Sequence, residues 1–143
     1  MGETLLRYRN DAASGAPVLS LADFLASDNA AAVRIEPAED ARALLPHLGR
    51  IALVEVNFPA YGDGRGYSSA RILREEGYTG ELRACGDVLL DQLSHMKRCG
   101  FDAFAPVKPI AADAAAKAIA TWPEVYQKTV DGRSPIWALR HGL

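Results

Sequence analysis

IALVEVNF, residues 51–58, is the most strand-like stretch of this sequence. Its apolar character is nearly continuous, which is typical of a strand that is covered on both faces in a parallel sheet. Glu55 and Asn57 interrupt it only near its carboxyl end. The stretch therefore predicts a central strand of an α/β fold.

Strand and helix patterns alternate on both sides of this stretch. Further strands are expected at residues 33–35, 81–85 and 102–107, and helices at residues 37–48, 67–76, 88–99 and 110–121. Strands that are joined by helices run parallel, with right-handed crossovers. The pattern predicts an α/β fold of repeated strand-helix units with a mainly parallel sheet, either open and doubly wound or a partial (half) barrel.

The length of 143 residues is that of a single domain. Residues 32–121 hold the βα units, residues 1–31 are expected to form an N-terminal cover or edge element, and residues 122–143 an irregular tail. A half barrel would leave an apolar sheet edge and face, and such a surface favours self-association. We therefore expect a homodimer.

The composition is that of an ordinary globular protein, with 49% apolar and 24% charged residues. The net charge of -2 argues against a general nucleic-acid or anionic-membrane binder, because such proteins need a large basic excess. The first residues carry charges where a signal peptide needs an apolar run, and no stretch approaches the roughly 20 apolar residues of a membrane span. We expect a cytoplasmic protein without nucleic-acid or membrane partners.

The sequence contains few groups that could hold a cofactor. Cys85 and Cys99 are its only cysteines, and they lack C-x-x-C or metal-ligand spacing, so buried reduced thiols are expected. There is no P-loop and no complete G-x-G-x-x-G motif. We expect neither a cofactor nor a metal.

Ligands of parallel α/β sheets bind at the carboxyl ends of the strands, which draws attention to the segment after residue 58. The candidate ligand-binding residues in this segment are Asp63, Gly64, Arg65, Gly66, Tyr67 and Ser68. Glycines let backbone N–H groups point inward, a helix N-terminus adds partial positive charge, and an arginine can clamp an oxyanion. The alternative is that the glycines only permit a tight turn, with Ser68 capping the next helix.

Three further residues are candidates for the same site. Arg71 either extends the positive surface or pairs with nearby glutamates. Arg83 stands in a strand, and if it is buried it needs a partner, for which Glu55, Asp87 and Asp102 are candidates. Asp87 follows that strand and is either the N-cap of the helix expected at residues 88–99 or an acid-base group.

The central block of the chain has a distinctive set of motifs. It contains FP at residues 58–59, DGRGYS at 63–68, GYTGELRACGDVL at 77–89, DQL at 91–93 and RCGFD at 98–102. With these motifs the chain resembles a proteobacterial family of unknown function whose members are typically encoded beside assimilatory sulfite reductase genes. The resemblance implies a cytoplasmic role in sulfate assimilation, near the enzyme that reduces sulfite to sulfide.

Three functions are compatible with these observations. The first is an accessory protein of sulfur (sulfite or sulfate) assimilation that binds a partner protein, such as sulfite reductase, or a small oxyanion through residues 63–74. The second is a small enzyme for a phosphorylated or sulfonated metabolite, with Arg65 and Arg83 as oxyanion clamps and Asp63 or Asp87 as the base. The third is a dimeric scaffold in which the glycine loop is structural.

Overall fold

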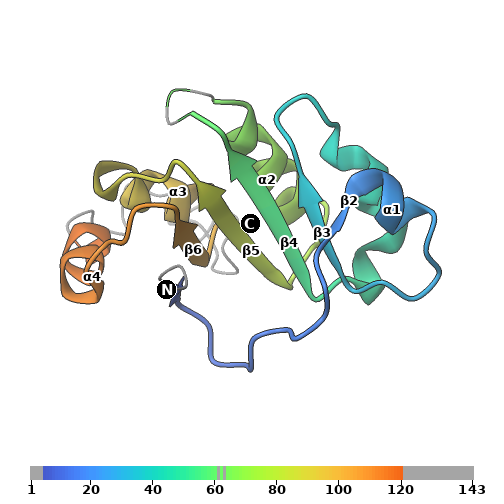
Figure 1. Cartoon of the computed structure of the whole chain (residues 1–143), viewed down its shortest axis with the longest axis horizontal. Coiled ribbons are helices and arrows are strands. Elements are labelled where there is room, and N and C mark those ends of the chain that lie inside the picture. Colours follow the sequence, from blue (N-terminus) through green and yellow to red (C-terminus); the bar gives the residue numbers. More distant parts are fainter. Residues whose placement is uncertain (1–4, 61, 63, 121–143) are drawn as a thin grey trace, which may run out of the picture.

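The computed structural model describes residues 5–60, 62 and 64–120 (Figure 1). The tail that is expected at residues 122–143 lies outside this part of the chain. In order, the elements are β1 (Leu6–Arg7), β2 (Leu19–Ser20), α1 (Leu21–Leu25), β3 (Ala32–Ile35), η1 (Ala41–Arg50), β4 (Leu53–Phe58), α2 (Arg65–Glu75), β5 (Glu81–Gly86), η2 (Leu90–Gln92), α3 (Leu93–Cys99), β6 (Ala103–Pro106) and α4 (Ala112–Ala120). Here η denotes a 3₁₀-helix.

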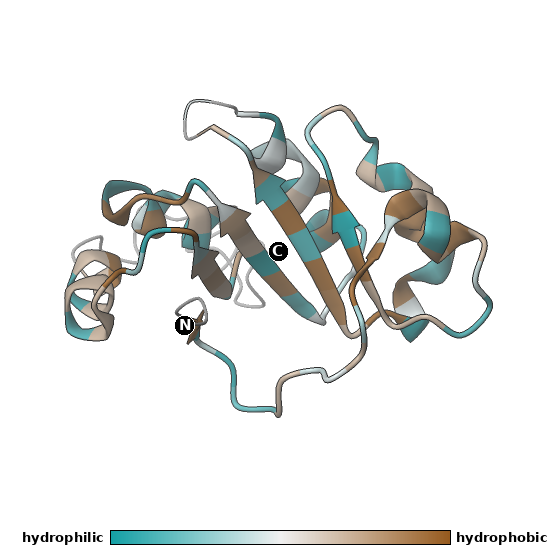
Figure 2. Ribbon diagram, in the orientation of Figure 1, coloured by the Kyte–Doolittle hydropathy of each residue, from teal (hydrophilic) through white to brown (hydrophobic). Residues whose placement is uncertain are grey.

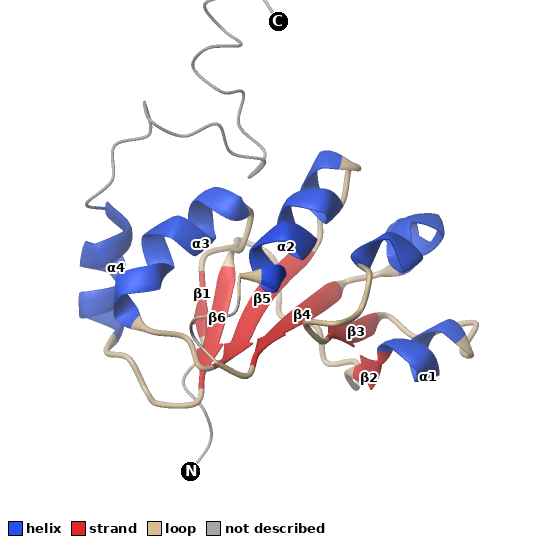
Figure 3. Ribbon diagram, turned by 90° about the horizontal axis from the view of Figure 1, so that it is seen from above, coloured by secondary structure: helices blue, strands red, loops and turns tan. Residues whose placement is uncertain are grey.

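The strands form one sheet of six in the order β1-β6-β5-β4-β3-β2. Only β1 is antiparallel to its neighbour, so the predicted α/β class and mainly parallel sheet are confirmed. The parallel strands follow one another in chain order, and Figure 3 shows α2, α3 and α4 along one side of the sheet. A doubly wound sheet reverses its strand order and carries helices on both sides, so that alternative is wrong. The described sheet is open, and the partial barrel stays a prediction.

The hydrophobic core lies between the sheet and these helices. Alternate strand residues such as Val54, Val56 and Phe58 point into it and belong to one cluster with Leu73 of α2 and Met96 of α3. All five are at most 1% exposed. The core therefore fixes the helices against a single face of the sheet.

The opposite face carries a charged row. The strand register places Ser20, Arg34, Glu55, Arg83, Ala103 and Arg7 side by side across all six strands. Hydrophilic bands cross the strands in Figure 2, which views the molecule from this side. This face is therefore not uniformly apolar, and the homodimer remains a prediction.

Three helices begin later than their sequence patterns predict, and α4 does so by two residues, at Ala112. The helix expected at residues 37–48 is the 3₁₀-helix η1, which starts at Ala41 because the side chain of Asp40 caps it. Pro46 lies inside η1 and has no N–H to donate, which disfavours an α-helix there. The helix expected at residues 88–99 begins as η2 at Leu90 and becomes α-helical at Leu93.

The N-terminal segment contributes a strand to each edge of the sheet. β1 lies beside β6 at one edge and β2 lies beside β3 at the other. The segment between them, residues 8–18, crosses below the amino ends of the intervening strands (Figure 1). In the part of the chain that the structure describes, no helix has the length and apolar character needed to cross a membrane.

Candidate functional site

Helix α2 starts at Arg65, two residues before the predicted start. Ser68 is therefore within the first turns of the helix and does not cap it, so the capping alternative is wrong for this residue. The N-cap is Gly64, which has no side chain to accept a hydrogen bond from the first N–H groups. Asp63, the first residue of the predicted site, lies outside the described residues.

Gly66 is the point of closest approach between α2 and the sheet. A Cβ atom at this position would lie 2.5 Å from Phe58 Cζ and 3.0 Å from Val56 Cγ1. The Phe58 ring is held in turn by Tyr67 and Phe101, at centroid distances of 5.3 and 5.8 Å. Gly66 does not have a positive φ, so its backbone conformation does not require glycine. Glycine is needed here because a larger side chain would collide with the sheet.

The first two turns of α2 form one wall of a cavity of about 270 Å³ at the carboxyl end of the sheet. Arg65 and Ser68 stand exposed on this wall, beside the buried Ser69. Residues 37–42, which lead into η1, form the facing wall and add the guanidinium of Arg42. Of the predicted residues, the structure thus brings Arg65 and Ser68 together at the uncapped start of a helix.

Two carboxylates also lie on the facing wall, and both have local hydrogen-bond partners. Glu39 Oε1 accepts a hydrogen bond of 2.8 Å from the backbone N–H of Glu36. Asp40 Oδ1 accepts one of 3.0 Å from the backbone N–H of Arg42 and lies 3.4 Å from that arginine's guanidinium. One oxygen of each carboxylate therefore serves the turn that precedes η1.

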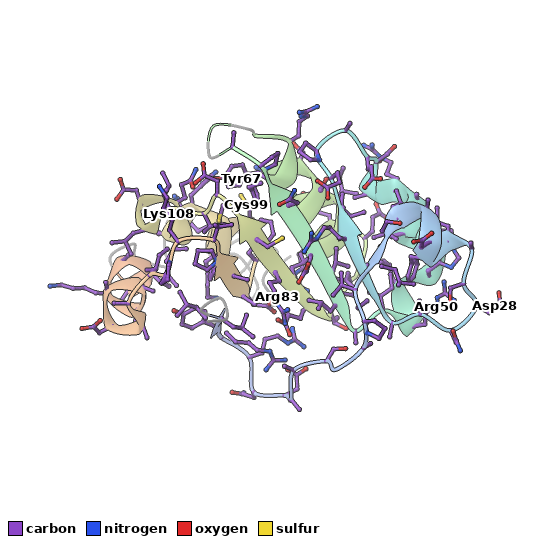
Figure 4. All side chains as sticks on the ribbon, viewed as in Figure 1. Asp28, Arg50, Tyr67, Arg83, Cys99 and Lys108 are labelled. Atoms are coloured by element: carbon purple, nitrogen blue, oxygen red, sulfur yellow. The ribbon has the colours of Figure 1, made fainter. Side chains whose placement is uncertain are left out.

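Tyr67 and Arg71 do not line this cavity. Tyr67 packs against His95 of α3, with ring centroids 4.8 Å apart, and His95 Nε2 lies 3.8 Å from Cys99 Sγ. Figure 4 shows Tyr67 and Cys99 in this region between α2 and α3. Arg71 is exposed on α2 and acts electrostatically on both His95 and Cys99. The predicted extension of the oxyanion site by Arg71 is therefore not seen in the cavity.

The cysteines are buried free thiols, as predicted. Burial raises the pKa of the Cys99 thiol and outweighs the lowering by Arg71 and Arg98. Cys85, on the charged face of the sheet, lies 3.6 Å from the carbonyl oxygen of Val56. Among the described residues, no group of three or more His, Cys, Asp or Glu side chains is arranged to hold a metal ion.

Arg83 belongs to the charged face of the sheet (Figure 4) and is not among the residues that line the Arg65 cavity. Its guanidinium lies 3.4 Å from Glu55 Oε2, as predicted, and 2.8 Å from Glu81 Oε2. Glu55 also binds Arg34 at 2.8 Å, and Glu81 binds Arg7 at the same distance. Arg83 is thus a member of an ion-pair network, and its predicted role as an oxyanion clamp beside Arg65 is not supported by its position.

Asp87 lies at the carboxyl end of the sheet, where its backbone N–H donates to the carbonyl oxygen of Phe58 at 2.7 Å. It is not a helix N-cap, because η2 begins at Leu90 with Leu89 as its N-cap. It is also not among the residues that line the Arg65 cavity.

Sequence reasoning missed two groups of residues. The first is the wall at residues 37–42, which the expected helix at 37–48 concealed. The second is the set Arg7, Arg9 and Asp11, which form ion pairs at the amino ends of the strands. Their alternation with Tyr8 and Asn10 was a usable signal, because every second residue of an extended segment points to the same side.

Comparisons with known proteins give a family but no described relative. No curated protein and no solved structure matches the chain. Residues 32–137 match the family described as bacterial protein of unknown function, DUF934. This range covers most of the chain, including every strand from β3 to β6 and the whole Arg65 cavity. The chain therefore belongs to the DUF934 family of bacterial proteins of unknown function.

Proposed function

We propose that this chain is a small accessory protein of sulfur assimilation that binds a sulfur oxyanion, such as sulfite or sulfate, in the Arg65 cavity. The observation that carries the proposal is that Arg65, Ser68 and the start of α2 share one cavity. Backbone N–H groups at a helix N-terminus attract anions, and a guanidinium adds charge and paired donors. The sulfur context is the one that the resemblance of the central block implies.

The formal charges on the cavity walls balance, because Arg65 and Arg42 line it together with Glu39 and Asp40, and Arg42 lies 3.4 Å from Asp40. Arg65 stands on the helix wall, where it would supply the charged donors to an anion. A volume of about 270 Å³ suits a small inorganic anion better than a nucleotide or another large cofactor. The proposal therefore concerns a small oxyanion.

The test is thermal unfolding of the purified protein with sulfite, sulfate and phosphate, compared with chloride at equal ionic strength. A ligand at 100 times its Kd stabilises the native state by about 2.7 kcal/mol, which raises Tm by several degrees. We expect this shift for the wild type and its loss in Arg65→Ala.

Arg71→Ala is the matched control, because Arg71 is an exposed arginine of the same helix that does not line the cavity. Its response to the anions should equal that of the wild type. The proposal fails if the oxyanions give no more stabilisation than chloride, or if Arg65→Ala responds like the wild type. In that case, co-purification with sulfite reductase would examine the protein partner that the resemblance suggests.

A further inference from the structure

The N-terminal strap, residues 8–18, holds a carboxylate between two arginines. Asp11 Oδ1 lies 2.7 Å from the guanidinium of Arg7 and 3.0 Å from Arg9 Nε, and Asp11 Oδ2 lies 2.8 Å from the second Arg9 donor. Arg9 therefore binds both oxygens of this carboxylate, and Arg7 binds one of them. Paired donors of this kind recognise carboxylates and tetrahedral oxyanions generally.

Each arginine is also held by groups other than the Asp11 carboxylate, and Arg7 in addition donates to the backbone carbonyl oxygens of Asp11 and Ala12. Arg7 Nε binds Glu81 at 2.8 Å, and a terminal nitrogen of Arg9 binds Asp102 at 2.7 Å. The side chains of Glu81 and Asp102 are 2% and 15% exposed, whereas that of Asp11 is 56% exposed. The inner carboxylates thus hold the guanidiniums in place, and the outer carboxylate is the replaceable partner.

Two cavities share Arg9 and Asp11 in their walls. One has about 410 Å³ and is lined by Arg7, Arg9 and Asp11 together with the loops before β4 and β5. The other has about 390 Å³ and is lined by Arg9, Asp11, Arg74 and Lys97 among others. Both volumes fall in the range of small-ligand sites.

The charge balance shows what removal of Asp11 from the arginines would leave. The connected ion pairs join five arginines with four carboxylates, which leaves one excess positive charge: Arg7, Arg9, Arg34, Arg74 and Arg83 with Asp11, Glu55, Glu81 and Asp102. Without Asp11 the network has two excess positive charges, and Lys97 on the second cavity adds another. An incoming anion would replace the charge that Asp11 supplies.

We propose that Arg7 and Arg9 form a second anion site, for a small carboxylate or tetrahedral oxyanion, which Asp11 occupies as an internal ligand. The site lies at the amino ends of the strands, opposite the Arg65 cavity, and shares no residue with it. An external anion must displace Asp11 in order to bind. The strap is thereby coupled to ligand binding through its own carboxylate.

The test is calorimetric titration of Asp11→Asn with succinate and with sulfate at constant ionic strength. All proteins carry Arg65→Ala, so that binding at the other cavity does not contribute and the two proposals can fail separately. Asp11 competes with the external anion at an effective concentration of about millimolar or more, because it is part of the same chain. Its replacement by asparagine should therefore tighten anion binding about tenfold or more. The ratio of succinate to sulfate affinity then distinguishes a carboxylate site from an oxyanion site.

Two control variants isolate the arginine clamp. Asp23→Asn removes the same charge from an exposed residue of α1 and should bind like the parent. Asp11→Asn with Arg9→Lys keeps the positive charge but loses the paired donors, and should return the affinity to the parent level. The proposal is overturned if Asp11→Asn binds the anions no more tightly than the parent. It is also overturned if the tighter binding persists when Arg9 is replaced by lysine.

The chain with Asp11 intact provides an independent measurement, which does not depend on the folding of a variant. Excess succinate or sulfate should shift the Nε–H signal of Arg9 in NMR spectra, because this N–H donates to the Asp11 carboxylate that the anion replaces. An unchanged signal at saturating anion would also overturn the proposal. The Nε–H signal of Arg50, which lies over the ring of Phe24, is the internal reference.

Discussion

Replacing Gly66 by alanine tests how α2 is seated on the sheet. The added methyl carbon would lie 2.5 and 2.7 Å from two atoms of the Phe58 ring and 3.0 Å from Val56 Cγ1. Ordinary contact between carbon atoms needs about 3.5 Å or more. Relief of the clash requires a movement of about 1 Å by the helix or by a buried ring that also contacts Tyr67 and Phe101.

The expected magnitude follows from two opposing effects. Overpacking of a buried contact costs about 1–3 kcal/mol, and alanine recovers up to about 1 kcal/mol over glycine through its helix propensity. Because Phe58 is 1% exposed and held on several sides, we expect the clash to dominate. The net loss should be about 1–2 kcal/mol, which for a chain of this size lowers Tm by roughly 3–8 °C.

The assay is urea unfolding followed by circular dichroism, with Gly49→Ala as the matched control. Gly49 lies in η1, and a Cβ atom there would have no atom within 4 Å. Its replacement should change the free energy of unfolding by no more than about 0.5 kcal/mol. If Gly66→Ala were as stable as the wild type or more stable, the inferred contact between α2 and β4 would be refuted.

Two further predictions concern charged groups. Glu81→Ala should lower the free energy of unfolding by about 3–5 kcal/mol, because it leaves Arg7 and Arg83 without a carboxylate that is 1% exposed; a loss below about 1 kcal/mol in urea unfolding would contradict this. Burial, aided by Arg98 and Arg71, lowers the pKa of His95 below 6.5. As pH falls, His95 is therefore protonated in the unfolded chain before it is protonated in the folded one. Stability should therefore fall as pH drops below 6.5, and less steeply in His95→Gln; equal pH profiles would refute it.

The repeating strand-helix pattern was predictable because each unit contains its own signals. The apolar run at residues 51–58 and the glycine at 100 correctly indicated β4 and the end of α3. The starts of the helices were predicted less well. The N-caps at Asp40 and Gly64 depend on the geometry of the preceding turns, which residue propensities do not indicate. The order of the strands in the sheet could not be predicted either. Alternating strands and helices can place the helices on one face of the sheet or on both faces.

The candidate site was predictable in part. Arg65 and Ser68 lie near the start of α2 on one cavity wall, as the rule for carboxyl ends of parallel strands suggests. Arg83 was misplaced because side chains alternate along a strand, and the strand register decides which carboxylates it meets. The contacts of Arg9 with Asp102 join residues 93 positions apart, and no local pattern indicates such a pair.

The most direct test of the account is a ¹H–¹⁵N NMR titration of the wild type with sulfite and with sulfate. If the oxyanion binds in the Arg65 cavity, the backbone amide signals of Arg65, Gly66 and Ser68 will shift and saturate together, and they will stay unchanged in Arg65→Ala. If these signals do not move, or move equally with chloride at the same ionic strength, the cavity at the start of α2 is not an oxyanion site.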